Sequence, residues 1–181
     1  MKKWGWWISL TVLAVVVSLI EWRTAIPTGT LDVQIAGVFL AVLCLSLNVM
    51  WSYVSLVIVA IVMVLMNVQN GWTVLPILLS LIIISVMLRW RTSLDVHMTH
   101  SQAINFGLIV GGSQFIGMLL IVAVQTMMMT TKWDEFLAVL EMALPGSLLN
   151  GLLDCLLVPP LNLLVRHYTE KRSNNYYITK K

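Results

Sequence analysis

Residues 144–165 read Leu-Pro-Gly-Ser-Leu-Leu-Asn-Gly-Leu-Leu-Asp-Cys-Leu-Leu-Val-Pro-Pro-Leu-Asn-Leu-Leu-Val. This segment is long and apolar enough to cross a bilayer as a helix. It nevertheless contains Asn150, Asp154, Asn162 and a double proline. A carboxylate near the middle of a spanning helix costs roughly 2.5–3.5 kcal/mol on insertion scales, so it normally faces the protein interior or a water-filled cavity. We therefore expect this segment to form one wall of a functional site.

The composition of the whole chain indicates a membrane protein. Its 181 residues are 59% hydrophobic and only 10% charged, with a mean hydropathy of +0.90, whereas soluble domains carry about 25% charged residues. Cys44 and Cys155 lie inside apolar runs and are expected to be small buried residues without a disulfide. We expect no nucleic-acid partner, because the positions of the charges explain the net charge of +3.

Hydropathy predicts the fold. Six segments approach the length of about 20 apolar residues that a span requires: 6–22, 33–50, 51–68, 73–88, 103–129 and 143–165. We predict an all-α integral membrane protein with six transmembrane helices in one bundle, forming a single domain over 1–181. An ordered loop is expected over 23–32, a short amphipathic lead-in before the sixth span, and a basic cytoplasmic tail over 166–181. Pro159 and Pro160 are expected to kink or end the last helix.

The charges predict the orientation of this bundle. Six spans place both termini on one side, and that side carries nine basic residues: Lys2, Lys3, Arg89, Arg91, Arg166, Lys171, Arg172, Lys180 and Lys181. The other side carries only Arg23 and Lys132. The positive-inside rule therefore places both termini in the cytoplasm, and the eight tryptophans fall at predicted helix ends, as interfacial aromatic belts require. The expected location is the bacterial plasma membrane, as a multi-pass protein in the lipid bilayer.

Enzyme chemistry is not indicated. His97 and His100 have a spacing that could place two metal ligands on a helix, but no third ligand is evident beyond Asp95, and a solvated loop is the favoured interpretation. The sequence has no Walker loop and no nucleophile–base pair. We therefore predict no catalytic activity, no cofactor and no metal site.

Polar and aromatic residues gather instead in the predicted extracellular half. The predicted topology brings six of them there, and they are the candidate substrate-binding residues: Asn70, Trp72, Gln125, Trp133, Ser147 and Asn150. Convergent polar groups of this kind suit a pocket for a small polar molecule. The alternative is that they are separate interfacial residues that never meet. Gln114 is expected either to form an interhelical hydrogen bond or to contact ligand, and Asp154 to be a buried structural group.

Small residues predict two close helix contacts. Gly107 and Gly111 have the GxxxG spacing, which permits close approach of helix backbones. Packing within the bundle is favoured over a partner surface. Ala14 and Ser18 form a small-xxx-small pair on the first helix and are the candidate partner-docking residues.

Three stretches resemble the substrate-binding S components of energy-coupling factor (ECF) vitamin transporters: residues 10–21, residues 26–37, and Trp133 through Ala143-Leu-Pro-Gly-Ser-Leu-Leu-Asn-Gly151. The resemblance implies six helices with cytoplasmic termini and a first outer loop that acts as a lid. It also implies capture of a water-soluble vitamin from outside. The first three helices would dock, through Ala14 and Ser18, on a transmembrane coupling subunit powered by two ATPase subunits.

The final helix is also similar to that of MreD-type rod-shape-determining membrane proteins. The similarity rests on Pro145-x-x-Leu148-Leu149-Asn150, a later proline and a basic tail, together with length and helix number. This second resemblance implies a scaffold that binds cell-wall synthesis proteins and transports no ligand.

Overall fold

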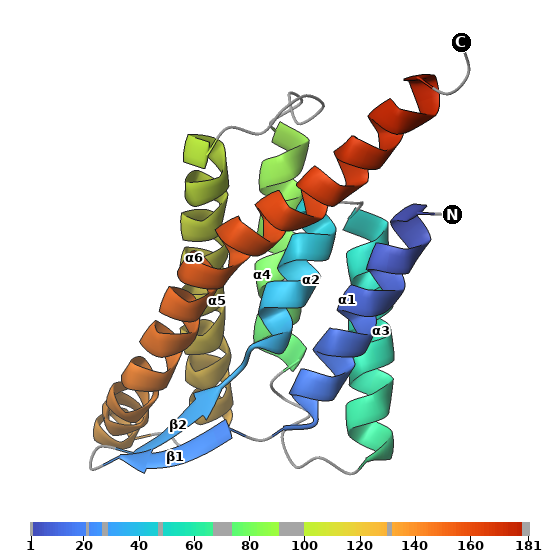
Figure 1. Cartoon of the computed structure of the whole chain (residues 1–181). Helices are drawn as coiled ribbons and strands as arrows, with labels where there is room; N and C mark the ends of the chain where they lie inside the picture. The colour runs from blue at the N-terminus through green and yellow to red at the C-terminus, as the bar shows by residue number, and fades with distance from the viewer. Residues whose placement is uncertain are drawn as a thin grey trace.

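The computed structural model describes residues 2–20, 22–26, 29–46, 49–66, 74–90, 100–129 and 132–178. These residues form six helices and one hairpin: α1 (Lys2–Ser18), β1 (Trp22–Ile26), β2 (Gly29–Val33), α2 (Ala36–Ser46), α3 (Val49–Leu65), α4 (Val74–Trp90), α5 (His100–Met129) and α6 (Trp133–Ile178). The helices lie side by side, and the hairpin covers the end of the bundle opposite the start of α1 (Figure 1). The prediction of a helical protein with six helices is confirmed for these residues.

Two helices are long and apolar enough to cross a membrane. They are α5 and the Trp133–Tyr168 part of α6, and only 33% of the most apolar window of each is buried inside the protein. The apolar parts of α1 to α4 are shorter, between 10 and 17 residues. Helix length and composition therefore mark two candidate spans, which is fewer than the six expected.

The segment between α1 and α2 differs from the expected loop. β1 and β2 pair antiparallel, with Trp22 opposite Val33 and Ile26 opposite Gly29. Two residues separate Ile26 from Gly29, which is the commonest hairpin loop length. Tryptophan, isoleucine, valine and threonine favour strands, so the first helix ends at Ser18 and not at residue 22.

The observed helix α6 differs from the predicted final helix in three ways. It runs without interruption for 46 residues, through Pro145, Pro159 and Pro160. There is no separate lead-in, the double proline does not end the helix, and helix continues through the expected tail to Ile178. Two missing amide donors weaken a helix locally, but the packing of α6 along α5 over this region holds its path.

Glycines form the seam between α5 and α6. A Cβ atom added at Gly111 would meet the carbonyl oxygen of Gly151 and the Sγ of Cys155. One added at Gly107 would lie 2.5 Å from Cγ of Pro159 and 2.9 Å from the carbonyl oxygen of Cys155. The predicted role of the GxxxG pair in packing within the bundle is therefore confirmed.

The helix α2 forms the core of the bundle. Nine of its eleven residues are buried, and it contacts α1, α3, α4 and α6. Eleven residues span only about 16 Å, roughly half the thickness of a bilayer's hydrocarbon core.

We predict that Gly111→Ala destabilises the protein by about 1–3 kcal/mol, because the added methyl group must displace the backbone of α6. Gly112→Ala is the matched control, since nothing lies within 4 Å of a Cβ atom at that position. Thermal unfolding of the two variants in detergent measures the difference. Equal melting temperatures would contradict the proposed seam.

Candidate functional site

The middle part of α6, residues 147–162, carries four buried polar side chains. Ser147, Asn150, Asp154 and Asn162 each have an exposed fraction of 1% or less. Asn150 and Asn162 both contact α2 or the residues that lead into it. The polar groups that distinguish the last helix in the sequence therefore face the interior of the bundle.

Asn150 holds the beginning of α2. Its Oδ1 accepts a hydrogen bond of 2.6 Å from the backbone N–H of Gln34, and its Nδ2 donates one of 2.9 Å to the carbonyl oxygen of Gly146. Amides at the beginning of a helix have no partner within the helix. Asn150 supplies an acceptor just before α2 starts and so fixes where the chain enters the bundle.

A second contact holds the end of α2. Ser46 Oγ donates to Asn162 Oδ1 at 2.5 Å, and Arg166 Nη2 donates to the carbonyl oxygen of Leu45 at 2.8 Å. Free carbonyl groups at the end of a helix carry partial negative charge, which a guanidinium group neutralises. Arg166 therefore satisfies a carbonyl group that would otherwise lack a partner.

The two contacts have the same register. Gln34 pairs with Asn150 and Ser46 with Asn162, and the residue numbers differ by 116 in both pairs. Twelve residues of α6 thus run parallel to the twelve that separate Gln34 from Ser46. We call these two contacts the α2 clamps. They fix the position of α2 along α6 as well as its distance from it.

Between the α2 clamps lie buried polar groups without a partner among the described residues. Both amide atoms of Gln114 are unpaired, as are Oδ1 of Asp154 and Oε1 of Gln34. Gln114 is 0% exposed and Asp154 is 1% exposed. Each buried polar group left unpaired costs about 1–3 kcal/mol. These three side chains are the part of the interior that the fold alone does not explain.

The four predicted substrate-binding residues that the structure describes do not lie in one cluster. Ser147 and Asn150 lie together on α6, but Trp133 lies 17 residues before Asn150 on the same helix, about 25 Å away. Trp133 is 65% exposed and stacks on Phe136. Gln125 is half-buried and lies near the last turn of α5.

The polar groups of Ser147 and Asn150 form hydrogen bonds within the protein. The Ser147 hydroxyl donates to the carbonyl oxygen of Ala143 on its own helix, and Asn150 forms the first α2 clamp. Asn70 and Trp72 lie outside the described residues. Among the described residues, no three His, Cys, Asp or Glu side chains form a metal-binding group.

The predicted docking pair does not present one exposed surface. Ala14 is completely buried in the core, and the Ser18 hydroxyl donates to the carbonyl oxygen of Val15 at 2.7 Å. The small size of Ala14 serves packing inside the chain. The exposed face of α1 carries larger apolar side chains, among them Val12 and Val16.

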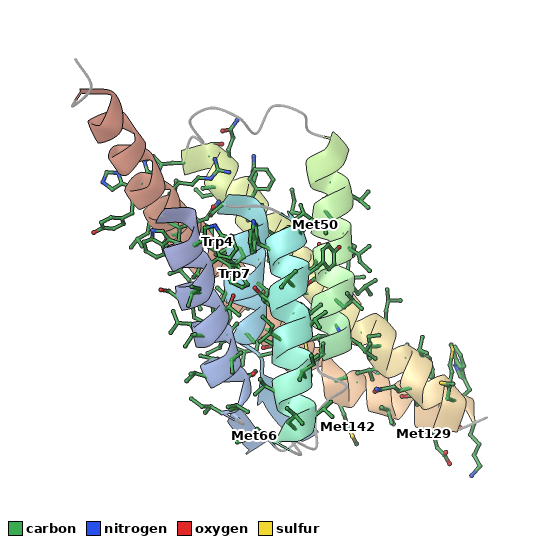
Figure 2. The ribbon with its side chains drawn as sticks, turned by 90° about the vertical axis from the view of Figure 1, so that its right-hand side faces the viewer. Trp4, Trp7, Met50, Met66, Met129 and Met142 are labelled. Atoms are coloured by element: carbon green, nitrogen blue, oxygen red, sulfur yellow. The ribbon has the colours of Figure 1, made fainter. Side chains whose placement is uncertain are left out.

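An aromatic cluster joins α1 and α3 at one end of the bundle. The rings of Trp4 and Trp7 lie 4.7 Å and 4.8 Å from that of Trp51, and Trp7 Nε1 donates to Ser55 Oγ at 2.9 Å. Trp4, Trp7 and Met50 lie at this end, and Met66, Met129 and Met142 lie toward the other (Figure 2). Three of the tryptophans predicted to lie at the membrane interface, Trp4, Trp7 and Trp51, therefore also pack α1 against α3.

The sequence does not predict the contacts of Gln34 and Arg166 with the α2–α6 interface. It predicts Arg166 in the basic tail and gives no signal for a role of Gln34. Gln114 was identified as an unusual polar residue, and the structure confirms its burial but shows no interhelical hydrogen bond to it among the described residues.

No protein-family model, curated protein or solved structure matches this chain.

We predict that Asn150→Leu destabilises the protein by about 1–3 kcal/mol, because the part-buried N–H of Gln34 loses its acceptor. Ser147→Ala is the control: Ser147 is equally buried, but its hydroxyl bonds only its own helix, so its loss should have little effect. Thermal unfolding in detergent compares the two. If both variants have the melting temperature of the wild type, Asn150 does not hold α2.

Proposed function

We propose that the chain is an integral membrane protein with six spans and cytoplasmic termini. Two helices suit a bilayer by length and composition, and their low burial differs from that of a core helix in a soluble protein. Large apolar side chains are also exposed on α1, α3, α4, α5 and α6, among them Val12, Val16, Val57, Ile61, Val86, Leu108, Leu120, Leu152 and Leu156. A lipid environment would cover these side chains without cost.

The proposed orientation rests on the ends of α1 and α6. The ring of Trp6 lies 6.0 Å from that of Tyr168, so the start of α1 and the basic end of α6 lie at the same end of the bundle. The positive-inside rule assigns that end to the cytoplasm. The hairpin, at the opposite end (Figure 1), would then face outward.

Labelling of single cysteines tests this topology after Cys44 and Cys155 are replaced. A membrane-impermeant maleimide should label Lys132→Cys in intact cells and Ser173→Cys only after permeabilisation, because the two positions would lie on opposite sides. Labelling of both variants in intact cells, or the reverse order, would contradict the proposed orientation.

Within the membrane, we propose that the protein is a non-enzymatic scaffold of the MreD type, which acts by binding cell-wall synthesis proteins. One observation carries this choice: the asparagines of the final helix form hydrogen bonds inside the bundle. Asn150 of the Pro145-x-x-Leu148-Leu149-Asn150 motif forms the first α2 clamp, and the later Pro159 lies against Gly107. These residues build a rigid bundle, whereas a ligand site would need their polar groups free.

An ECF-type S component is the second candidate function. It is favoured by the unpaired buried groups of Gln34, Gln114 and Asp154, which suit the binding of a small molecule. It is also favoured by the hairpin between α1 and α2, in the place where the resemblance implies a lid. A coupling subunit and two ATPases would then be the partners, and a vitamin the ligand.

Depletion of the protein in its native bacterium separates the two functions. The scaffold proposal predicts loss of normal cell shape and copurification of cell-wall synthesis proteins with the tagged chain. It also predicts no thermal stabilisation of the purified protein by any member of a B-vitamin panel. Normal shape after depletion, together with stabilisation by one vitamin, would overturn the scaffold in favour of the transporter subunit.

A further inference from the structure

Three buried side chains carry oxygen atoms without a partner in the part of the chain that the structure describes. They are Oε1 of Gln34, Oε1 of Gln114 and Oδ1 of Asp154. Gln114 and Asp154 are among the most deeply buried residues of the bundle. Buried polar atoms in folded proteins are nearly always hydrogen-bonded or bound to an ion or water. A water molecule or an ion beside these side chains would supply the partner that the three oxygens lack.

Contacts between the helices place the three side chains at one level of the bundle. Asn150 bonds Gln34, and Asp154 lies one turn further along α6. Gly37 lies about one turn after Gln34, and a Cβ atom added to it would be 3.8 Å from both Nε2 and Oε1 of Gln114. The first turn of α2 therefore faces Gln114 on one side and the Asn150–Asp154 turn on the other.

The seam between α5 and α6 agrees with this placement. Gly111 contacts Gly151 and Cys155, the residues that flank the 152–154 segment, and Cβ of Phe115 would lie 3.1 Å from a Cβ atom added at Gly151. Gly111 is thus level with the 151–155 segment and Phe115 with Gly151, so Gln114 lies within about one helical turn of Asp154 along the seam. The three side chains come from three elements that contact one another in this region.

Among the described side chains, no cationic group lies close to Asp154. The carboxyl group lies beside the first turn of α2, and burial opposes its ionisation unless a cation binds next to it. Arg166 lies twelve residues further along α6, about 18 Å away, and is engaged with Leu45. Lys132 lies still further away, beyond the start of α6, beside Glu135. A buried carboxyl group either takes up a proton or needs a counter-charge close to it.

The donor set indicates the chemical class of the occupant. Amide and carboxylate oxygens bind hard cations, whereas nitrogen and sulfur ligands select zinc and copper. A single carboxylate is neutralised by one positive charge. A divalent ion would leave a net charge in a medium that solvates it poorly.

We propose that a monovalent alkali cation binds between α2, α5 and α6, held by Oε1 of Gln34, Oε1 of Gln114 and Oδ1 of Asp154. The cation satisfies the three oxygens at once and joins the start of α2 to both long helices. The site is independent of whether the protein is a scaffold or a transporter subunit.

The test measures melting temperature on the purified full chain in lipid nanodiscs. The salts are NaCl, KCl and N-methylglucamine chloride at equal ionic strength. A ligand that binds only the folded state raises stability with its concentration, so at least one alkali salt should raise the melting temperature above that in N-methylglucamine. Asp154→Asn removes the charge and Gln114→Met removes the oxygen at similar volume, and both should abolish the difference between salts.

Ser113→Ala is the matched control and should keep the difference. Ser113 is buried next to Gln114 on α5, but its hydroxyl donates to the carbonyl oxygen of Ile109. Equal melting temperatures of the wild type in all three salts would overturn the site and would indicate a protonated Asp154. If Asp154→Asn does not fold, Gln114→Met decides: an alkali-dependent shift that persists in this variant also overturns the proposal.

Discussion

The position of α2 against α6 is the constraint on which the rest of the bundle depends. A helix leaves the backbone groups at its two ends without partners inside the helix. Asn150 accepts from the backbone N–H of Gln34 just before α2 begins, and Arg166 donates to the carbonyl oxygen of Leu45 near its end. Asn162 adds a bond from the hydroxyl of Ser46. Since α1, α3 and α4 pack around α2, the α2 clamps also determine where those helices lie.

The α5–α6 seam supports this arrangement from the other side. Glycines at 107, 111 and 151 allow the two backbones to approach closely. Side chains larger than hydrogen would move α6 away from α5 and change the distances at the α2 clamps. The large apolar residues of the two long helices therefore form much of the exposed surface, and their small and polar residues serve the interior.

The sequence predicted the number of helices because most of them are long apolar runs. Burial of Asp154 also followed from the cost of a carboxylate in an apolar helix. The pairing of Asn150 with Gln34 could not be predicted, since the two lie 116 residues apart and only the packed bundle brings them together. The helix does not end at Pro159 and Pro160, where Pro159 packs against Gly107 of α5.

The continuity of α6 has a mechanical consequence. From Arg166 to Ile178 the helix continues for about 18 Å past the second α2 clamp, with no break between the two. A force applied to the 166–178 segment would be transmitted along the helix. A protein bound to this segment would therefore load the bonds from Arg166 and Asn162 to α2. The 166–178 segment is thus coupled mechanically to the centre of the bundle, and Arg166 lies at the point where the helix leaves α2.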